Sequence, residues 1–383
     1  MFKAGSNRFV TVAALAAVLG GTATTASAAS TDMVGWLLAN KPNATHAYFP
    51  AAATSFNSAG AQNVVTPISA GYYEINFRGL YNGGKNNNQQ VSAIGTSGYC
   101  MSSGWDTEGD HHGAQMWVRC VDRHGHPANA KFTVLYQSRK TPIGDSSHGI
   151  AFLWADGPTS SSYTPSIDYN YNSTGALNTI TRTDTGVYVV HMPGLTGTGG
   201  DVQVTAYDSL GNNPSRCNVG PNRWTPPGGL GETTADIRCF DKTGAPADEY
   251  FSFAYTVNMP FSQINGGSTV GGYAWADKPK KTSLYTPSAP WNFNSAGSDL
   301  MQAQNLGRGL YQVNVPADLQ NVPSLVLMTA VQSTGFAPTA YCNIDTWFPV
   351  TAKCYKQGGV LVDSQFDVAV DAGPGTGALK RPH

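Results

Sequence analysis

Hydrophobic and polar residues alternate with a period of two in many short stretches of this chain. The clearest are "YEINF" (73–77), "VYVVHM" (187–192) and "YQVNV" (311–315), which are rich in β-branched and aromatic residues. Such stretches are typical of half-buried strands. Turn-forming residues separate them, as in "NGG" (82–84) and "TDTG" (183–186). The pattern therefore predicts an all-β protein made of short antiparallel strands.

A segment that begins at a cysteine recurs three times. It reads "CVDRHGHPANAKFTVLY" from Cys120, "CFDKTGAPADEYFSFAY" from Cys239 and "CYKQGGVLVDSQFDVAV" from Cys354. Three sequence markers precede this segment, in the same order in each copy. The first is a Pro motif ("LANKP", "WADGP", "WADKP"), and the second runs from a Tyr to an Asn ("YFPAAATSFNS", "YTPSIDYNYNS", "YTPSAPWNFNS"). The third is an expected strand that begins Gly-x-Tyr ("GYYEINF", "GVYVVHM", "GLYQVNV"). The period of about 115 residues is much longer than that of solenoid repeats, so each copy should be a domain.

We expect three tandem antiparallel β-sandwich domains of about 100 residues, each with roughly six to eight strands. Their predicted bounds are 29–138, 150–257 and 272–372, with linkers of about a dozen residues between them. A further strand is expected over 201–208 and 324–331, in repeats 2 and 3. Linkers of this length allow either a string of separate domains or a compact pseudo-threefold cluster.

The six cysteines fall two per repeat, at the same place in each repeat. An even count at matching positions in an exported chain indicates intradomain disulfides. The expected pairs are Cys100 with Cys120, Cys217 with Cys239, and Cys342 with Cys354. The first two close loops of about 20 residues, which the chain-entropy model values at on the order of 3 kcal/mol each, and the third closes a shorter loop.

The first residues have the features of a secretory signal peptide. Lys3 and Arg8 precede an apolar run that extends from Phe9 to about Leu19. Ala26-Ser27-Ala28 then matches an A-x-A cleavage site, so we expect residues 1–28 to be removed. No later stretch approaches ~18 uninterrupted apolar residues, so no membrane span is expected. Residues 373–383 have the composition of a flexible tail. The mature protein is predicted to be secreted, or periplasmic if its source is a Gram-negative bacterium.

The charge of the chain argues against one class of partner. Without the signal peptide the chain has 21 basic and 24 acidic side chains, a net charge of −3, and no basic run stands out. Nucleic-acid binding depends on concentrated positive charge that neutralises phosphates. We therefore expect no nucleic-acid partner, and the charge pattern gives no information on the oligomeric state.

Each disulfide loop contains a tryptophan, and these residues are Trp105, Trp224 and Trp347. A tryptophan next to a disulfide is commonly a core residue, as in immunoglobulin domains. Alternatively, the rings are exposed and stack on the apolar face of a sugar, while polar loop side chains bind its hydroxyls. Three weak sites of this kind would add through multivalency. The sequence leaves both interpretations open.

The disulfide loop and following turn of repeat 1 are rich in residue types that bind metals. The candidate ligands are Asp106, Glu108, Asp110, His111, His112, His124 and His126. The acidic residues alternate as the oxygen ligands of calcium would, and the histidines would suit zinc. Repeat 2 has threonine and alanine at matching positions and the calcium pattern is incomplete, so a solvated polar loop is the alternative. No other cofactor is expected.

Catalytic signatures are few in this sequence. "GDSSHG" (144–149) superficially resembles the Gly-Asp-Ser block of one esterase class, but it lies in a predicted linker without a strand-turn-helix context. No H-E-x-x-H, P-loop or dinucleotide-binding motif occurs. We therefore assign no catalytic residue.

The stretch from "VQVTAYDS" to "IRCFDKTGAPADEYFSFAYT" resembles a Cys-stapled β-sandwich repeat of uncharacterised exported bacterial proteins, and the likeness covers nearly the whole mature chain. The resemblance implies a secreted β-repeat protein and supplies no catalytic residues. Our leading hypothesis is a non-catalytic binding or surface-interaction protein whose ligand is a polysaccharide or cell-surface glycan. The alternatives are a secreted hydrolase or metal-dependent enzyme that uses the Asp/His-rich loop of repeat 1, and a structural or inhibitor-like module.

Overall fold

The computed structural model describes residues 32–374, apart from 82, 84–85, 107–112, 141, 209–210, 212, 226–230, 265–268, 321–323 and 334. The expected signal peptide and nearly all of the expected tail lie outside these residues. Most of the described chain is strand. Its short helical segments are η1 (Ala52–Thr54), η2 (Ile167–Tyr169), η3 (Ala289–Trp291) and α1 (Ala317–Gln320). No helix in this part of the chain is long and apolar enough to cross a membrane.

Each repeat contributes an inner half-sheet of four antiparallel strands in the same spatial order. In repeat 1 these are β2 (Ser55–Asn57), β1 (Met33–Ala39), β8 (Lys131–Ser138) and β5 (Asn87–Ile94). In repeat 2 they are β11 (Asn170–Asn172), β9 (Gly149–Ala155), β17 (Tyr250–Val257) and β14 (Asp201–Tyr207). In repeat 3 they are β19 (Asn292–Asn294), β18 (Thr269–Ala276), β26 (Gln365–Pro374) and β22 (Ser324–Val331). The strands expected over 201–208 and 324–331 are therefore present, and repeat 1 has an equivalent in β5.

Each repeat also contributes an outer half-sheet, which carries the disulfide. In repeat 1 it comprises β3 (Val64–Ser69), β4 (Tyr72–Arg78), β7 (Gly113–Val121) and β6 (Tyr99–Asp106). In repeat 2 it comprises β10 (Ser162–Tyr163), β12 (Thr179–Asp184), β13 (Val187–Pro193), β16 (Glu232–Phe240) and β15 (Arg216–Thr225). In repeat 3 it comprises β20 (Gln302–Gly307), β21 (Leu310–Asn314), β24 (Val350–Lys356) and β23 (Tyr341–Thr346), with β25 (Val360–Leu361) beside β24.

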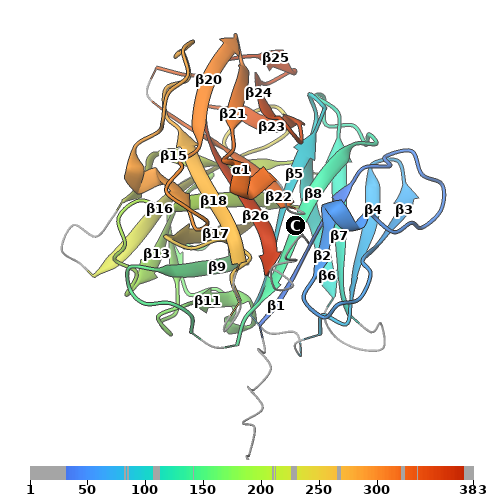
Figure 1. Cartoon of the computed structure of the whole chain (residues 1–383), viewed down its shortest axis with the longest axis horizontal. Helices are drawn as coiled ribbons and strands as arrows, with labels where there is room; N and C mark the ends of the chain where they lie inside the picture. The colour runs from blue at the N-terminus through green and yellow to red at the C-terminus, as the bar shows by residue number, and fades with distance from the viewer. Residues whose placement is uncertain are drawn as a thin grey trace, which may run out of the picture.

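The half-sheets of different repeats join into three continuous sheets. The disulfide strand of one repeat pairs in parallel with the edge strand of another repeat's inner half-sheet: β6 with β14, β15 with β22, and β23 with β5. The pairing runs from repeat 1 to repeat 2, from repeat 2 to repeat 3, and from repeat 3 back to repeat 1. The chain is therefore a closed pseudo-threefold cluster rather than a string of domains, and its three lobes are visible in Figure 1.

Within each repeat, the inner and outer half-sheets pack face to face around a hydrophobic core. In repeat 1, Tyr73, Ile75 and Phe77 of β4 are buried against Phe132 and Val134 of β8. The intervening residues of β4 are half-buried, as the period-two pattern predicts. The structure thus confirms the all-β fold built from three β-sandwich repeats.

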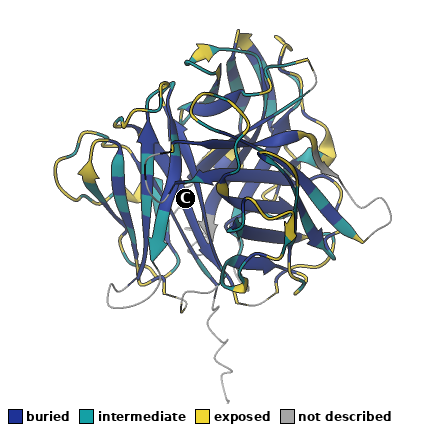
Figure 2. Cartoon of the chain, turned by 180° about the vertical axis from the view of Figure 1, so that it is seen from behind, coloured by how far each residue is buried: buried dark blue, intermediate teal, exposed yellow. Residues whose placement is uncertain are grey.

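A fourth core lies where the inner half-sheets of the three repeats converge. It contains Trp36 from repeat 1, Phe152 from repeat 2, and Tyr273 and Leu327 from repeat 3. The inner strands are consequently covered on both faces, and β5 and β22 are buried along their whole lengths. Seen from behind, buried residues fill the middle of the molecule and exposed residues are confined mostly to loops (Figure 2).

A ring of buried hydroxyl groups marks the pseudo-threefold axis. Ser92, Thr205 and Thr329 occupy matching register positions on β5, β14 and β22. Each side-chain oxygen accepts the backbone N–H of another repeat: Thr205 from Val91 at 2.9 Å, Thr329 from Val204 at 3.2 Å, and Ser92 from Met328 at 2.9 Å. These bonds satisfy buried backbone donors between repeats, so the hydroxyl ring ties the cluster together.

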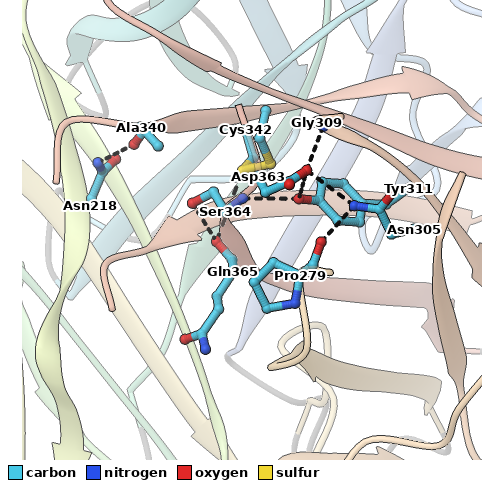
Figure 3. The surroundings of a disulfide bond; sticks show 11 residues. Asn218, Pro279, Asn305, Gly309, Tyr311, Ala340, Cys342, Asp363, Ser364 and Gln365 are labelled. Carbon is cyan, nitrogen blue, oxygen red and sulfur yellow. Dashed lines mark hydrogen bonds between the residues drawn. A yellow bond between two sulfur atoms is a disulfide. The ribbon is translucent and has the colours of Figure 1, made fainter. Parts of the chain in front are cut away.

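The recurring sequence motifs correspond to one polar network beside each disulfide. In repeat 3 (Figure 3), Asp363 accepts hydrogen bonds from the Gly309 amide at 2.8 Å and from the Tyr311 hydroxyl at 3.4 Å. The Tyr311 oxygen in turn accepts the Ser364 amide at 2.9 Å. Repeat 2 has the same arrangement around Asp248. The Gly-x-Tyr motif is therefore part of the scaffold.

All three expected disulfides form. The bonded pairs are Cys100–Cys120, Cys217–Cys239 and Cys342–Cys354. In each pair the two cysteines lie directly opposite one another on neighbouring antiparallel strands. No free cysteine remains.

The segments expected as linkers pack into the centre of the molecule. Arg139, just after β8, is fully buried and lies 3.8 Å from the carboxylate of Asp32. Its Nη2 donates to the carbonyl oxygen of Phe261, in the second connecting segment, at 2.7 Å. Ile143 joins the central core. These contacts hold the connections rigidly because a buried guanidinium must keep its partners.

Candidate functional site

The three tryptophans expected to bind ligand have different surroundings. Trp105, on β6, is half-buried and contacts aromatic residues of repeat 2. Trp347 is half-buried and packs against the core of repeat 3. The backbone of Trp224 pairs with Ala235, which is the register position of Trp105, but its side chain lies outside the described residues. The described rings, those of Trp105 and Trp347, therefore pack against different parts of the molecule.

Trp105 is part of an aromatic junction cluster, which we define as Trp105, Trp154, Tyr169, Tyr207 and Tyr250. The cluster lies where β6 of repeat 1 continues into the inner half-sheet of repeat 2. The Trp105 ring is perpendicular to that of Trp154, with their centroids 5.1 Å apart, and it lies 5.1 Å from Tyr169 and 5.4 Å from Tyr207. Edge-to-face contacts at this spacing are favourable for aromatic rings.

The aromatic junction cluster reaches the protein surface. Tyr250 is 41% exposed, and the other four rings are half-buried. Tyr250 stacks on Trp154 with a centroid distance of 6.1 Å and an interplanar angle of 26°. Ile167, in the short helix η2 that carries Tyr169, is 63% exposed. An apolar surface of this kind, held by rings that support one another, is suited to a flat ligand face.

Polar groups adjoin the cluster. Burial raises the pKa of the Tyr207 hydroxyl above its ordinary value, and the neighbouring Tyr169 and Asp208 add to the shift. Ser103, beside Trp105 on β6, donates to the Asp208 carbonyl oxygen at 2.8 Å and accepts from Arg119 at 2.9 Å. Ser103 and Asp208 are both buried, and the hydrogen bond between them links β6 of repeat 1 to the end of β14 of repeat 2.

The other two junctions lack this cluster. Four members of the cluster, Trp154, Tyr169, Tyr207 and Tyr250, have equivalents in the other two repeats. At the junction of repeats 2 and 3 the equivalents are, in the same order, Trp275, Trp291, Val331 and Gln365. At the junction of repeats 3 and 1 they are Leu38, Thr54, Ile94 and Lys131. Trp275 contacts Trp291 at 5.7 Å but is only 7% exposed. Among the described residues, the exposed aromatic surface therefore belongs to one junction and is not required by the repeat fold.

Of the expected metal ligands, the structure describes Asp106, near the start of β7, and His124 and His126, beyond its end. Glu108, Asp110, His111 and His112 lie outside the described residues. The described residues that flank them, Asp106 and Gly113, adjoin the start of β7, whereas His124 and His126 follow its end. A nine-residue strand separates its ends by roughly 26 Å. No cluster of three metal-binding side chains occurs among the residues described, and the metal site stays a prediction.

His124 and His126 instead belong to a tight turn. Oδ1 of Asp122 accepts the backbone N–H groups of His124 at 2.8 Å and of His126 at 2.9 Å. These bonds lower the pKa of Asp122. Both imidazoles are exposed, with their ring centroids 6.2 Å apart.

The "GDSSHG" segment also forms a turn. Oδ1 of Asp145 accepts hydrogen bonds from the Ser147 hydroxyl at 2.7 Å and from the His148 backbone N–H at 2.9 Å. These bonds hold the pKa of Asp145 well below its usual range. The Ser147 oxygen also lies 2.9 Å from Nδ1 of His148, which is itself 3.2 Å from Oδ1 of Asp145. All three groups belong to one turn of four residues and bond to the same carboxylate oxygen, whereas in a catalytic triad the histidine lies between the serine and the carboxylate.

One carboxyl group near the cluster has a strongly shifted pKa. Glu249 precedes Tyr250, is 5% exposed, and accepts a hydrogen bond from Asn213 at 2.8 Å. Burial raises the pKa of Glu249 to about 7, and the Asp208 carboxylate adds to the shift. A group of this kind can donate a proton near neutral pH. The adjacent cavity that Asp208 and Arg119 line has a volume of about 20 Å³, which is too small for a sugar ring.

Sequence reasoning identified Trp105 but missed the other four members of the cluster. Trp154 was visible as part of the "WADGP" motif, and Tyr250 differs from Lys131 and Gln365 at the matching positions. A position-by-position comparison of the three repeats would have shown these differences. The partner of Trp105 could not be found in this way, because it depends on the pairing of β6 with a strand from another repeat.

Fold and site together define a class: an all-β protein of three disulfide-stapled sandwich repeats that share their sheets cyclically, with an aromatic surface at one junction. A scan against protein-family models found no match, and neither did searches of curated proteins and of solved structures.

Proposed function

We propose that this protein is a non-catalytic carbohydrate-binding protein and that the aromatic junction cluster is its binding surface. The observation that supports the proposal most directly is that one junction presents five mutually supporting rings, with Tyr250 exposed, where the other junctions have mainly aliphatic, polar or buried residues. The expected export and the stapled scaffold are consistent with this role. The proposal places one aromatic site on each chain rather than three.

The chemistry of the surface fits a pyranose ring. One face of a pyranose is lined by C–H groups, which pack against an aromatic face, while its edge carries hydroxyl groups. Tyr250 supplies an exposed ring whose orientation is fixed by Trp154 beneath it. The hydroxyls of Tyr207 and Tyr250 can bind the sugar's edge.

The test is a glycan array followed by calorimetric titration of the ligands that bind, for the wild type and for Tyr250→Gln. Glutamine occupies the matching position in repeat 3, so the fold accepts it. Covering about 50 Å² of ring at ~25 cal/mol per Å² contributes roughly 1.3 kcal/mol, so we expect binding to weaken about tenfold. The matched control is Tyr81→Gln, because Tyr81 is 49% exposed and has no part in the cluster.

Three outcomes contradict the proposal. A wild-type protein that binds no glycan at high concentration removes its basis. Equal weakening in Tyr81→Gln shows that the effect is not specific to the cluster. Release of reducing sugar by the wild type that is lost in Glu249→Gln would replace the binding protein with a glycoside hydrolase that uses a carboxyl group beside the same surface.

A further inference from the structure

A small cavity lies on the pseudo-threefold axis, beside the hydroxyl ring. Its volume is about 50 Å³, enough for a few water molecules or one small ion. All three repeats line it with matching residues: Ser92, Thr205 and Thr329 from the hydroxyl ring, and the residues that precede the first cysteine of each repeat. Those residues are tyrosine in repeats 1 and 3 (Tyr99 and Tyr341) but arginine in repeat 2 (Arg216).

Arg216 is a buried cation without an ion-pair partner among the described residues. It is 5% exposed, and its guanidinium carbon lies 5.7 Å from the ring centroid of Tyr99 and 5.0 Å from that of Tyr341. Its Nη2 donates to Oε1 of Gln357 at 2.8 Å, and the Tyr99 hydroxyl lies close to the guanidinium. Nε and Nη1 are shielded from solvent and have no well-aligned hydrogen-bond partner in this part of the chain.

An unpaired buried cation of this kind is unfavourable. Desolvation lowers the pKa of Arg216, and the aromatic faces of Tyr99 and Tyr341 compensate only in part. Donors left unsatisfied in the interior also cost free energy. A counter-ion in the adjoining cavity would remove both penalties at once.

The turns that follow the second cysteine of each repeat meet next to this cavity. A Cβ placed on Gly125 would lie 3.2 Å from Cβ of Lys242, and one on Gly359 would lie 2.8 Å from Cδ of Arg123. The turns therefore touch one another and bring the basic side chains of Arg123 and Lys242 to this end of the axis. Two carboxylates lie in the same region, Asp122 and Asp241, and each is engaged by backbone N–H groups of its own turn. Asp241 acts on Arg216 electrostatically but forms no ion pair with it in the described chain. Basic groups near the cavity raise the local concentration of anions.

We propose that the axial cavity binds a single small anion, of the size of a halide, which Arg216 holds by Nε–H and Nη1–H. The anion is the counter-charge of the buried guanidinium and couples all three repeats, because each of them lines the cavity. Large organic anions are excluded by the volume of the cavity.

Bromide is the probe, because it is a small anion and its anomalous X-ray scattering identifies it. Crystals of the wild type in bromide should show an anomalous peak in the axial cavity beside Arg216. The matched variant is Arg216→Tyr, which gives repeat 2 the residue that repeats 1 and 3 already have. Its crystals should show no peak there. Arg216→Lys keeps the charge but loses the paired N–H groups, so a weaker peak is expected.

Thermal unfolding provides a second readout in solution. At constant ionic strength, replacing gluconate with bromide should raise the Tm of the wild type by about 2 °C or more and leave Arg216→Tyr unchanged. Gluconate is too large for the cavity and controls for ionic strength. The proposal is overturned if bromide at saturating concentration leaves the cavity without a peak in the wild type, or if bromide stabilises Arg216→Tyr equally. These readouts do not involve carbohydrate, so they are independent of the proposed function.

Discussion

Thr205→Val tests whether the hydroxyl ring stabilises the three-repeat cluster. Valine has nearly the shape of threonine but cannot accept or donate a hydrogen bond. The Thr205 hydroxyl accepts the Val91 amide at 2.9 Å and donates to Oε1 of Gln90 at 3.0 Å, and both of these groups belong to another repeat. All three residues are buried, so the substitution leaves two polar groups unsatisfied.

Each of the two buried groups that lose their partner costs about 1–3 kcal/mol, so we expect Thr205→Val to lower the free energy of unfolding by about 2–6 kcal/mol. The assay is equilibrium unfolding in urea, followed by circular dichroism and tryptophan fluorescence. Thr179→Val is the matched control. Thr179 lies half-buried on β12 and makes no side-chain hydrogen bond to the described chain, so its change should stay within about 0.5 kcal/mol.

The reasoning is refuted if Thr205→Val costs no more than Thr179→Val. It is also refuted if the wild type unfolds in three separate transitions, because strands shared between repeats should make the cluster unfold as one unit.

Two further predictions concern buried groups of the scaffold. Burial raises the pKa of Asp371 to about 7, and the unfolded chain releases this proton at lower pH, so the folded state binds more protons between the two values. We therefore expect Asp371 to lower the free energy of unfolding by on the order of 2 kcal/mol between pH 5 and pH 8, and Asp201 and Glu249, whose pKa values burial also raises, to add to this fall. Asp371→Asn should remove its own share and so reduce the slope; an unchanged slope in urea titrations would count against the assignment. Gly71 has φ +65°, and a Cβ there would lie 2.3 Å from the carbonyl oxygen of Cys120, whereas Gly60 has φ +75° and open space around its Cβ position. Gly71→Ala should lower the Tm clearly more than Gly60→Ala, because only the first adds a backbone clash to the conformational strain, and equal shifts would contradict the reported contact.

The sequence predicts the fold class and the disulfides because both depend on patterns within a repeat. Period-two alternation on β4, β13 and β21 reports one buried face directly. The inner edge strands are harder to recognise. Asn88, Gln89 and Gln90 on β5 are polar but buried. Asn88 and Gln90 hydrogen-bond to repeat 2, and Gln89 donates to Ser102 of β6. A polar run of this kind has no period that marks a strand, so its partner in another repeat could not be predicted.

The aromatic junction cluster could also be predicted only in part, because it depends on contacts between repeats. Trp105 stands out in the sequence because it lies between two cysteines, but its neighbours Trp154 and Tyr207 come from repeat 2. Only the parallel pairing of Ser102 with Tyr207 brings them together. Arg216 was equally visible as the residue that replaces tyrosine before a cysteine. Its importance depends on lying at the axis, which a linear comparison does not reveal.

Sharing of sheets explains how repeats with the same topology can carry different chemistry. A single repeat would expose the edges of β5 and β6 or their equivalents, and unpaired edges promote association with other chains. Cyclic pairing covers these edges through one backbone pattern, in which Asp208, Gly95 and Gln332 each donate to a carbonyl of another repeat at 2.8–2.9 Å. Because these bonds use backbone atoms, they do not specify the side chains around them. Each junction can therefore differ in its side chains without loss of the fold, as the aromatic surface at one junction and the single arginine at the axis illustrate.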